Sequence, residues 1–119
     1  MKVERKSSYG ILYIKSEVDT SIYPVVKDAL KSNDRELRVS TISDIGTLRD
    51  RHFISEIVDL LSDPDYSVRA TAADAISIIG TKKEIPYLFE VIRKDTVNFV
   101  ISDAIYSIVE LGDLNTANY

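Results

Sequence analysis

The sequence predicts an all-α protein, a solenoid of about seven helices in which helical hairpins stack in one row. The chain repeats itself with a period of about 31 residues, and apolar residues inside each repeat recur every three or four positions. Asp, Pro and Gly residues separate these apolar segments. The 119 residues suffice for one domain with its own core, which divides into a partial repeat 1–31 and repeats 32–62, 63–94 and 95–119.

The repeat is clearest in the middle of the chain. The run Ser32–Arg38 aligns with Asp63–Arg69, a shift of 31 residues (63 − 32), and the register continues without a gap to residue 92. The last repeat follows after 32 residues (95 − 63), with Asp95 in the register of Asp63. A short period with helical spacing inside each unit is typical of stacked helical repeats.

The first segment is ambiguous by itself. Residues 3–14 contain β-branched and aromatic side chains that are also typical of a strand. Their apolar and small positions, however, reproduce the spacing of the later helices, and a lone strand would have no partner here. We therefore predict a helix at the start, followed by a second one with Ile22, Val25, Val26 and Ala29 on its apolar face.

The next repeat contributes a helix with an apolar register running from Leu37 to Leu48, and then a helix Ile54–Leu61. This register places Gly46 inside a helix, where glycine costs about 1 kcal/mol relative to alanine. Ending the helix at Gly46 would lose the match at Leu48, so we prefer the interior placement.

The third repeat is the best defined. Apolar and small residues recur over Val68–Ile79, and Asp63-Pro64-Asp65 before them ends one helix and offers a cap to the next. Gly80 ends the stripe, as a left-handed C-terminal residue would. A helix from about Glu84 to Lys94 follows, with Pro86 in its first turn, and the fourth repeat carries the first helix of this pair again.

The run Asp63–Gly80, followed by Ile85-Pro86-Tyr87-Leu88, resembles HEAT repeats, specifically the short phycobilisome-lyase-type HEAT-like repeat. That repeat has the pattern D-P-x-x-V-R-x-x-A-A-x-A-L-x-x-I-G followed by I-P-x-L. The resemblance covers residues 32–112 and implies an α-α superhelix in which the second helix of each unit lines a concave inner wall. It is specific for the fold, whereas the family spans scaffolds, lyase subunits and other modules.

On this analogy the wall carries aromatic and acidic residues at positions that the repeat does not need for packing. Tyrosine is enriched in protein interfaces, and the acidic residues gather at the C-terminal end, opposite a basic end with Lys2, Arg5, Lys6 and Arg35. The plainer alternatives are solvated helix faces and rings that cover helix seams. The predicted partner-binding residues are Tyr9, Tyr13, Arg35, Glu36, Tyr66, Asp74, Phe99, Asp103, Tyr106 and Glu110.

Such a wall predicts a non-enzymatic module that binds a basic protein, and in a sharper form an inhibitor or immunity-type protein. One alternative is a lyase-type subunit for bilin attachment, as the resemblance implies. Another is nucleic-acid backbone binding through the basic N-terminal helix, which the net charge of −4 opposes. A homodimer through the last helix is also predicted, because Ile101, Ile105 and Val109 lack a following unit to pack against.

Nothing in the sequence favours chemistry. The chain has no Cys and one His, His52 in a polar stretch, so we predict no metal, no cofactor and no catalytic residue. Arg38 and Arg69 belong to the repeat pattern itself, and we expect them to bond to loop residues such as Asp34 or Asp65. No stretch approaches the roughly 20 apolar residues that span a bilayer, and no signal peptide is evident, so we expect a cytoplasmic protein.

Overall fold

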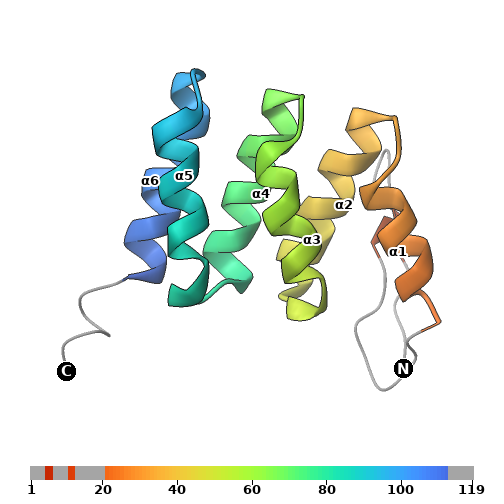
Figure 1. Ribbon diagram of the computed structural model, residues 1–119. Coiled ribbons are helices and arrows are strands. Elements are labelled where there is room, and N and C mark those ends of the chain that lie inside the picture. Colours follow the sequence, from red (N-terminus) through yellow and green to blue (C-terminus); the bar gives the residue numbers. More distant parts are fainter. Residues whose placement is uncertain (1–4, 7–10, 13–20, 113–119) are drawn as a thin grey trace.

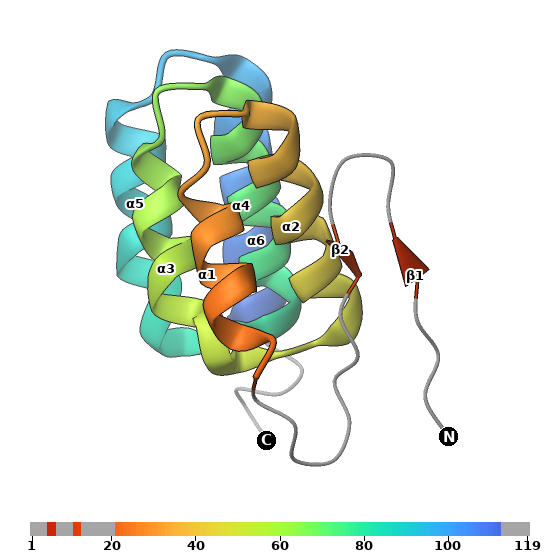
Figure 2. The ribbon, with the colours of Figure 1, turned by 90° about the vertical axis from the view of Figure 1, so that its right-hand side faces the viewer.

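The structure is a computed structural model that describes residues 5–6, 11–12 and 21–112. Within these ranges the chain is predominantly α-helical, and its six α-helices alternate between two layers (Figures 1 and 2). The wall helices are α2 (Arg35–Leu48), α4 (Tyr66–Ile79) and α6 (Asn98–Leu111), and the outer helices are α1 (Tyr23–Leu30), α3 (Ile54–Asp59) and α5 (Ile85–Lys94). The predicted stack of helical hairpins is confirmed.

Short 3-10 segments adjoin the outer helices. They are η1 (Arg51–Phe53) before α3, η2 (Leu60–Ser62) after it and η3 (Lys82–Glu84) before α5. The helix predicted over residues 54–61 is therefore α3 extended by the first residues of η2. Its length allows the outer layer to keep pace with the longer wall helices.

The helix predicted at the N-terminus is wrong, so the described chain has six α-helices and not seven. Strands β1 (Arg5–Lys6) and β2 (Ile11–Leu12) pair antiparallel, with Arg5 opposite Leu12 and Lys6 opposite Ile11 (Figure 2). The prediction assumed that a strand here would lack a partner, but the same segment supplies one. β2 also packs against α2 and thereby takes the place that the first wall helix was expected to fill.

Aspartates begin the helices, as the loop composition predicts. The carboxylate of Asp34 accepts from the Glu36 backbone N–H at 2.9 Å, and that of Asp65 accepts from the Ser67 N–H at 2.7 Å. Before α5, Thr81 and Glu84 form a capping box, in which the Thr81 N–H donates to Glu84 Oε1 at 2.6 Å. Each cap satisfies backbone donors that the first helical turn leaves unpaired.

The core lies between the two layers, and α4 is at its centre, packed against both α2 and α6. Small residues bring the wall helices close together, since the Ser107 hydroxyl of α6 donates to the Ala73 carbonyl of α4 at 2.6 Å. The described side chains that are at most 1% exposed are Ile42, Ile45, Phe53, Ile57, Val68, Ala72, Ala73, Ile76, Leu88, Val100, Ala104 and Ser107. Burial of these side chains is the main source of stability for the stack.

Two glycines respond to opposite demands. Gly46 lies inside α2, as predicted, and a Cβ there would lie 3.6 Å from Ala75 of α4, an ordinary van der Waals contact. Gly80 ends α4 with φ −81°, so the predicted left-handed cap is wrong. It is close approach that requires glycine there, because a Cβ would lie 2.6 Å from the Ile76 carbonyl oxygen.

Replacing each glycine by alanine should therefore change stability in opposite directions. We expect Gly46→Ala to raise the free energy of unfolding by about 0.5–1 kcal/mol, because alanine favours helix and fits the space. We expect Gly80→Ala to lower it by about 1–2 kcal/mol, because the backbone must shift to relieve the clash. Urea unfolding of both variants measures the two values, and equal changes would contradict this assignment.

Candidate partner-binding face

The predicted site residues that the structure describes lie on all three wall helices. Arg35 and Glu36 are in the first turn of α2, and Tyr66 and Asp74 lie on α4. Phe99, Asp103, Tyr106 and Glu110 lie on α6. Lys2, Tyr9 and Tyr13 are outside the described residues, and Arg5 and Lys6 belong to β1 instead of a wall helix.

Two of the aromatic residues meet between α4 and α6. The rings of Tyr66 and Phe99 pack edge to face, with centroids 5.3 Å apart and planes at 84°. Both side chains remain about half exposed, at 48% and 47%, and Tyr106 on α6 is 57% exposed. The packing fixes the two rings in place and still leaves apolar surface for another molecule.

Two carboxylates, Asp74 of α4 and Asp103 of α6, influence each other across the same pair of helices. Burial, and then the negative charge of Asp103, raise the pKa of Asp74 to about 6. Burial also raises the pKa of Asp103. No Lys, Arg or His in the described ranges forms an ion pair with either carboxylate, so a cation from another molecule would relieve their repulsion.

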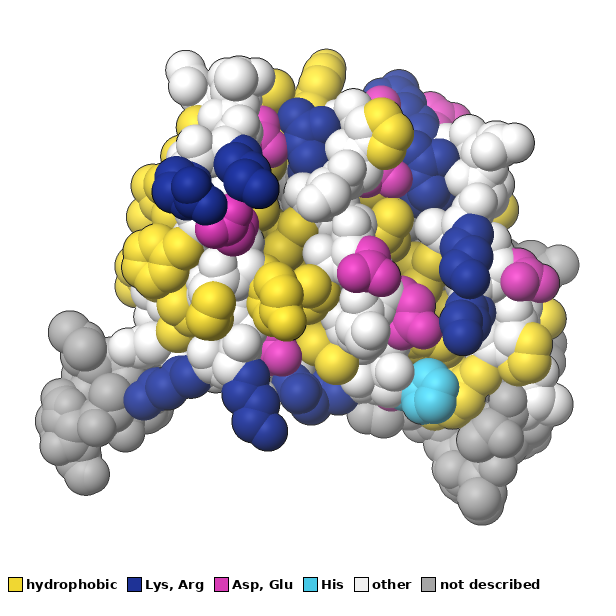
Figure 3. Space-filling model, viewed as in Figure 1, with side chains coloured by type: hydrophobic (Ala, Val, Ile, Leu, Met, Phe, Trp, Pro, Cys, Tyr) yellow, Lys and Arg dark blue, Asp and Glu magenta, His cyan; other side chains and the backbone are white. Residues whose placement is uncertain are grey.

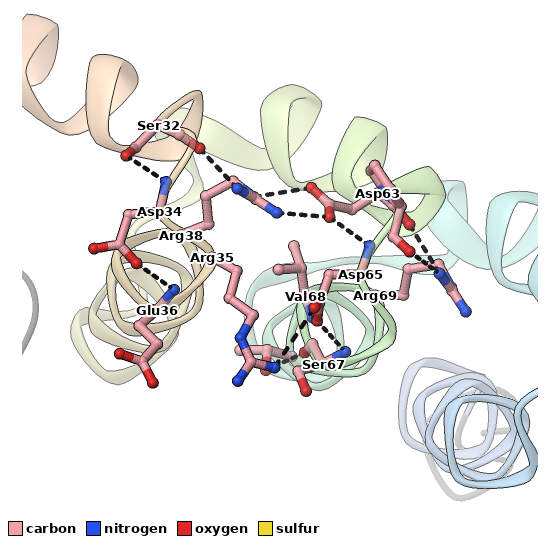
Figure 4. A network of polar contacts seen from close by, with 12 residues as sticks. Ser32, Asp34, Arg35, Glu36, Arg38, Asp63, Asp65, Ser67, Val68 and Arg69 are labelled. Atoms are coloured by element: carbon pink, nitrogen blue, oxygen red, sulfur yellow. Dashed lines mark hydrogen bonds and ion pairs between the residues drawn. The ribbon is translucent and has the colours of Figure 1, made fainter.

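The basic end that the sequence predicts is not a free cationic surface at Arg35. The Arg35 guanidinium donates to the Asp65 carboxylate at 3.5 Å and so links α2 to the cap of α4 (Figure 4). Burial alone would raise the pKa of Asp65, but hydrogen bonds from the Ser67 and Val68 N–H groups and the charge of Arg35 lower it. Arg35 therefore serves a contact between repeats, while Glu36 is exposed beside it.

Arg38 and Arg69 form a ladder of ion pairs along the loops, with partners other than those predicted. The Arg38 guanidinium donates to both oxygens of Asp63 at 3.0 Å, and its third bond reaches the Ser32 carbonyl at 2.7 Å (Figure 4). Arg69 repeats the arrangement one unit later, with bonds of 2.7 and 3.2 Å to Asp95. Each arginine thus holds the aspartate that opens the next repeat, 25 or 26 residues ahead, whereas we predicted Asp34 or Asp65.

His52 has a packing role that the sequence only outlined. Its ring stacks on Tyr23 of α1 with centroids 3.9 Å apart and meets Phe53 edge-on at 4.7 Å. Within the described ranges, no three His, Asp or Glu side chains gather in a way that could hold a metal ion. None of the described helices combines the length and apolar character needed to cross a membrane.

The charges of the outer helices contrast with those of the wall. In Figure 3, which views the outer helices, Lys and Arg side chains gather along the lower edge and at the top of α5, with acidic residues between them. Some are paired, as Lys27 is with Glu56 and Arg93 with Glu90. On the wall, Asp74, Asp103 and Glu110 have no such partner among the described cations.

Hairpins repeated in two layers along one axis define an α-α superhelical repeat protein. Comparison with known families agrees, since a family profile described as HEAT repeats matches residues 23–109. The chain therefore belongs to the HEAT-repeat family. No curated protein and no solved structure matches the chain. HEAT repeats generally mediate protein–protein interaction, and the family is typically a non-enzymatic scaffold.

Proposed function

We propose that this chain is a protein-interaction module that binds a basic protein partner through the acidic, aromatic face of its wall helices. The binding face consists of Tyr66, Asp74, Phe99, Asp103, Tyr106 and Glu110 on α4 and α6, with Glu36 at the start of α2. The observation that carries the proposal is the pair Asp74 and Asp103, because two interacting carboxylates without a cation form a site of high affinity for positive charge.

The aromatic residues support the same conclusion. Exposed Tyr66, Phe99 and Tyr106 supply large contact areas at a small cost in side-chain entropy, and the first two are already held by their mutual contact. A lysine or arginine entering beside the carboxylates would lie near these rings and gain a cation–π interaction. An inhibitor or immunity-type role would be this binding directed at a basic toxin.

Affinity capture with the 119-residue chain as bait, followed by calorimetry with the recovered protein, tests the proposal. We expect Asp74→Asn combined with Asp103→Asn to weaken binding at least about tenfold, and Tyr66→Ala and Tyr106→Ala to weaken it by a similar factor each. Asp59→Asn and Tyr87→Ala are matched controls, because both residues are exposed on outer helices, and they should leave binding unchanged.

The pH dependence provides a second readout of the same site. Because Asp74 has a pKa of about 6, protonation below that pH removes the charge that attracts the partner, so affinity should fall as the pH decreases through this value. Wall variants that bind as well as the wild type, or a partner that is acidic, would refute the proposed face.

A further inference from the structure

The stack ends on one side with apolar surface that no described element covers. On α6, Ile105 is 48% exposed and Val109 is 62% exposed, and on the neighbouring helix α5 Phe89 is 55% exposed. Figure 1 shows α5 and α6 together at this end of the row. We call the surface of Ile105, Val109 and Phe89 the end face.

Comparison of the repeats shows that the end face is built to receive a helix. Ile105 has the register of Ile42 in α2 and of Ala73 in α4, both of which are completely buried. Val109 has the register of Gly46, which is packed against Ala75 of the next wall helix. In the inner units the next helix covers these positions, so the end face presents to solvent the surface that elsewhere binds one.

The end face differs from the inner units in what it can bind. The register of Arg38 and Arg69 continues at Ile101, so α6 has no guanidinium with which to hold the first aspartate of another repeat. Val109 is also bulkier than its counterparts Gly46 and Ser77, which keeps an incoming helix further away. The occupant therefore relies on apolar contact and not on the ion-pair ladder.

Charge indicates which apolar helix fits. The sequence of α6 contains Asp103 and Glu110 and no Lys or Arg. Both acids lie on the wall side of the apolar stripe, since residues three to four positions apart share a side of a helix and Glu110 follows Asp103 by seven. A second copy of this chain paired along α6 would bring these carboxylates towards their own counterparts, which is unfavourable.

We propose that the end face binds an amphipathic helix of a partner protein, with an apolar stripe against Ile105, Val109 and Phe89 and basic residues beside Asp103 and Glu110. This site goes beyond the face of the wall helices and does not depend on Asp74. Apolar contact would hold the helix, and the acidic edge would orient it.

Two synthetic amphipathic peptides of about 18 residues test the proposal. They share a leucine stripe at helical spacing, and one carries lysines along one edge where the other carries glutamates. We expect the lysine peptide to bind the 119-residue chain saturably in fluorescence anisotropy, and the glutamate peptide to bind at least about tenfold more weakly. Ile105→Ser combined with Val109→Ser should weaken lysine-peptide binding at least about tenfold.

Controls separate this site from the wall face. Val25→Ser removes an exposed apolar side chain from α1 at the opposite end of the row and should leave peptide binding unchanged. Asp74→Asn should weaken capture of the basic partner but not peptide binding, whereas the end-face variant should do the reverse. Circular dichroism of each variant establishes that it is folded.

Three results would overturn the proposal. The first is no binding of the lysine peptide by the wild type, and the second is binding that the end-face variant retains. The third is concentration-dependent dimerisation of the wild type in analytical ultracentrifugation that the end-face variant abolishes. That outcome would assign the end face to a second copy of the chain.

Discussion

Arg69→Ala is expected to lower the free energy of unfolding by about 3–5 kcal/mol, because it leaves a buried carboxylate without its counter-ion. The side chain of Asp95 is 6% exposed and that of Arg69 is 17% exposed. Burial alone would raise the pKa of Asp95, but hydrogen bonds from Arg69 and from the Val97 N–H lower it, which reports how strongly the pair stabilises the charged form. Arg69 also donates to the Asp63 carbonyl at 2.9 Å, so its loss leaves that oxygen unpaired as well.

Urea unfolding of Arg69→Ala and of a matched surface variant distinguishes this from a general effect of removing an arginine. Arg93 pairs with Glu90 on α5, but its side chain is 67% exposed, so Arg93→Ala should change stability by less than about 0.5 kcal/mol. Arg69→Lys should retain only part of the stability, since an ammonium cannot form the paired bonds of a guanidinium. A loss below about 1 kcal/mol in Arg69→Ala would show that the ladder does not hold the repeats together.

Asp44→Ala is expected to stabilise the protein near neutral pH by about 2–3 kcal/mol. Asp44 lies on α2, is 8% exposed, and its Oδ2 has no hydrogen-bond partner within the described chain. Burial raises its pKa to about 6, above the value of about 3.9 in an unfolded chain. Alanine fits the position, because Ala75 of α4 has the same register and is buried.

The sign of the pH dependence follows from the raised pKa. Near pH 4 the carboxyl is mostly protonated in the folded protein, and its cost is small. As the pH increases through about 6 the folded state must ionise a buried group, and stability is lost. The gain from Asp44→Ala should therefore be small near pH 4 and full near pH 7.

Unfolding curves of both proteins across this pH range measure the effect, with Asp59→Ala as control because Asp59 is exposed on α3. The control should differ from the wild type by less than about 0.5 kcal/mol at every pH. Destabilisation by Asp44→Ala near neutral pH would mean that the carboxylate has a stabilising role that its contacts do not explain.

Much of the fold was predictable because the repeat states each helix more than once. The register of Val68–Ile79 recurs in α2 and α6, so Gly46 could be placed inside a helix despite its low propensity. The first segment had no second copy of comparable clarity. There, helical spacing competed with β-branched composition, and pairing of residues 5–6 with residues 11–12 decided for strands.

The candidate face was predictable in part. Positions on α4 and α6 followed from the register, which brought Asp74 near Asp103. The contact of Tyr66 with Phe99 and the capture of Arg35 by Asp65 depend on the offset between neighbouring hairpins, which the sequence does not state. The arginine partners were missed for the same reason, since we sought aspartates in the same loop and the bonds cross to the next one.

Periodic apolar spacing and the Asp, Pro and Gly residues between segments were enough to determine the helices, their order and the two-layer stack, because these are local preferences repeated along the chain. Only the tertiary structure decided which charges neutralise one another. The distance between two side chains in different repeats depends on how closely the helices pack, and that is set by buried side chains such as Ala73 and Ser107 far from the charges themselves.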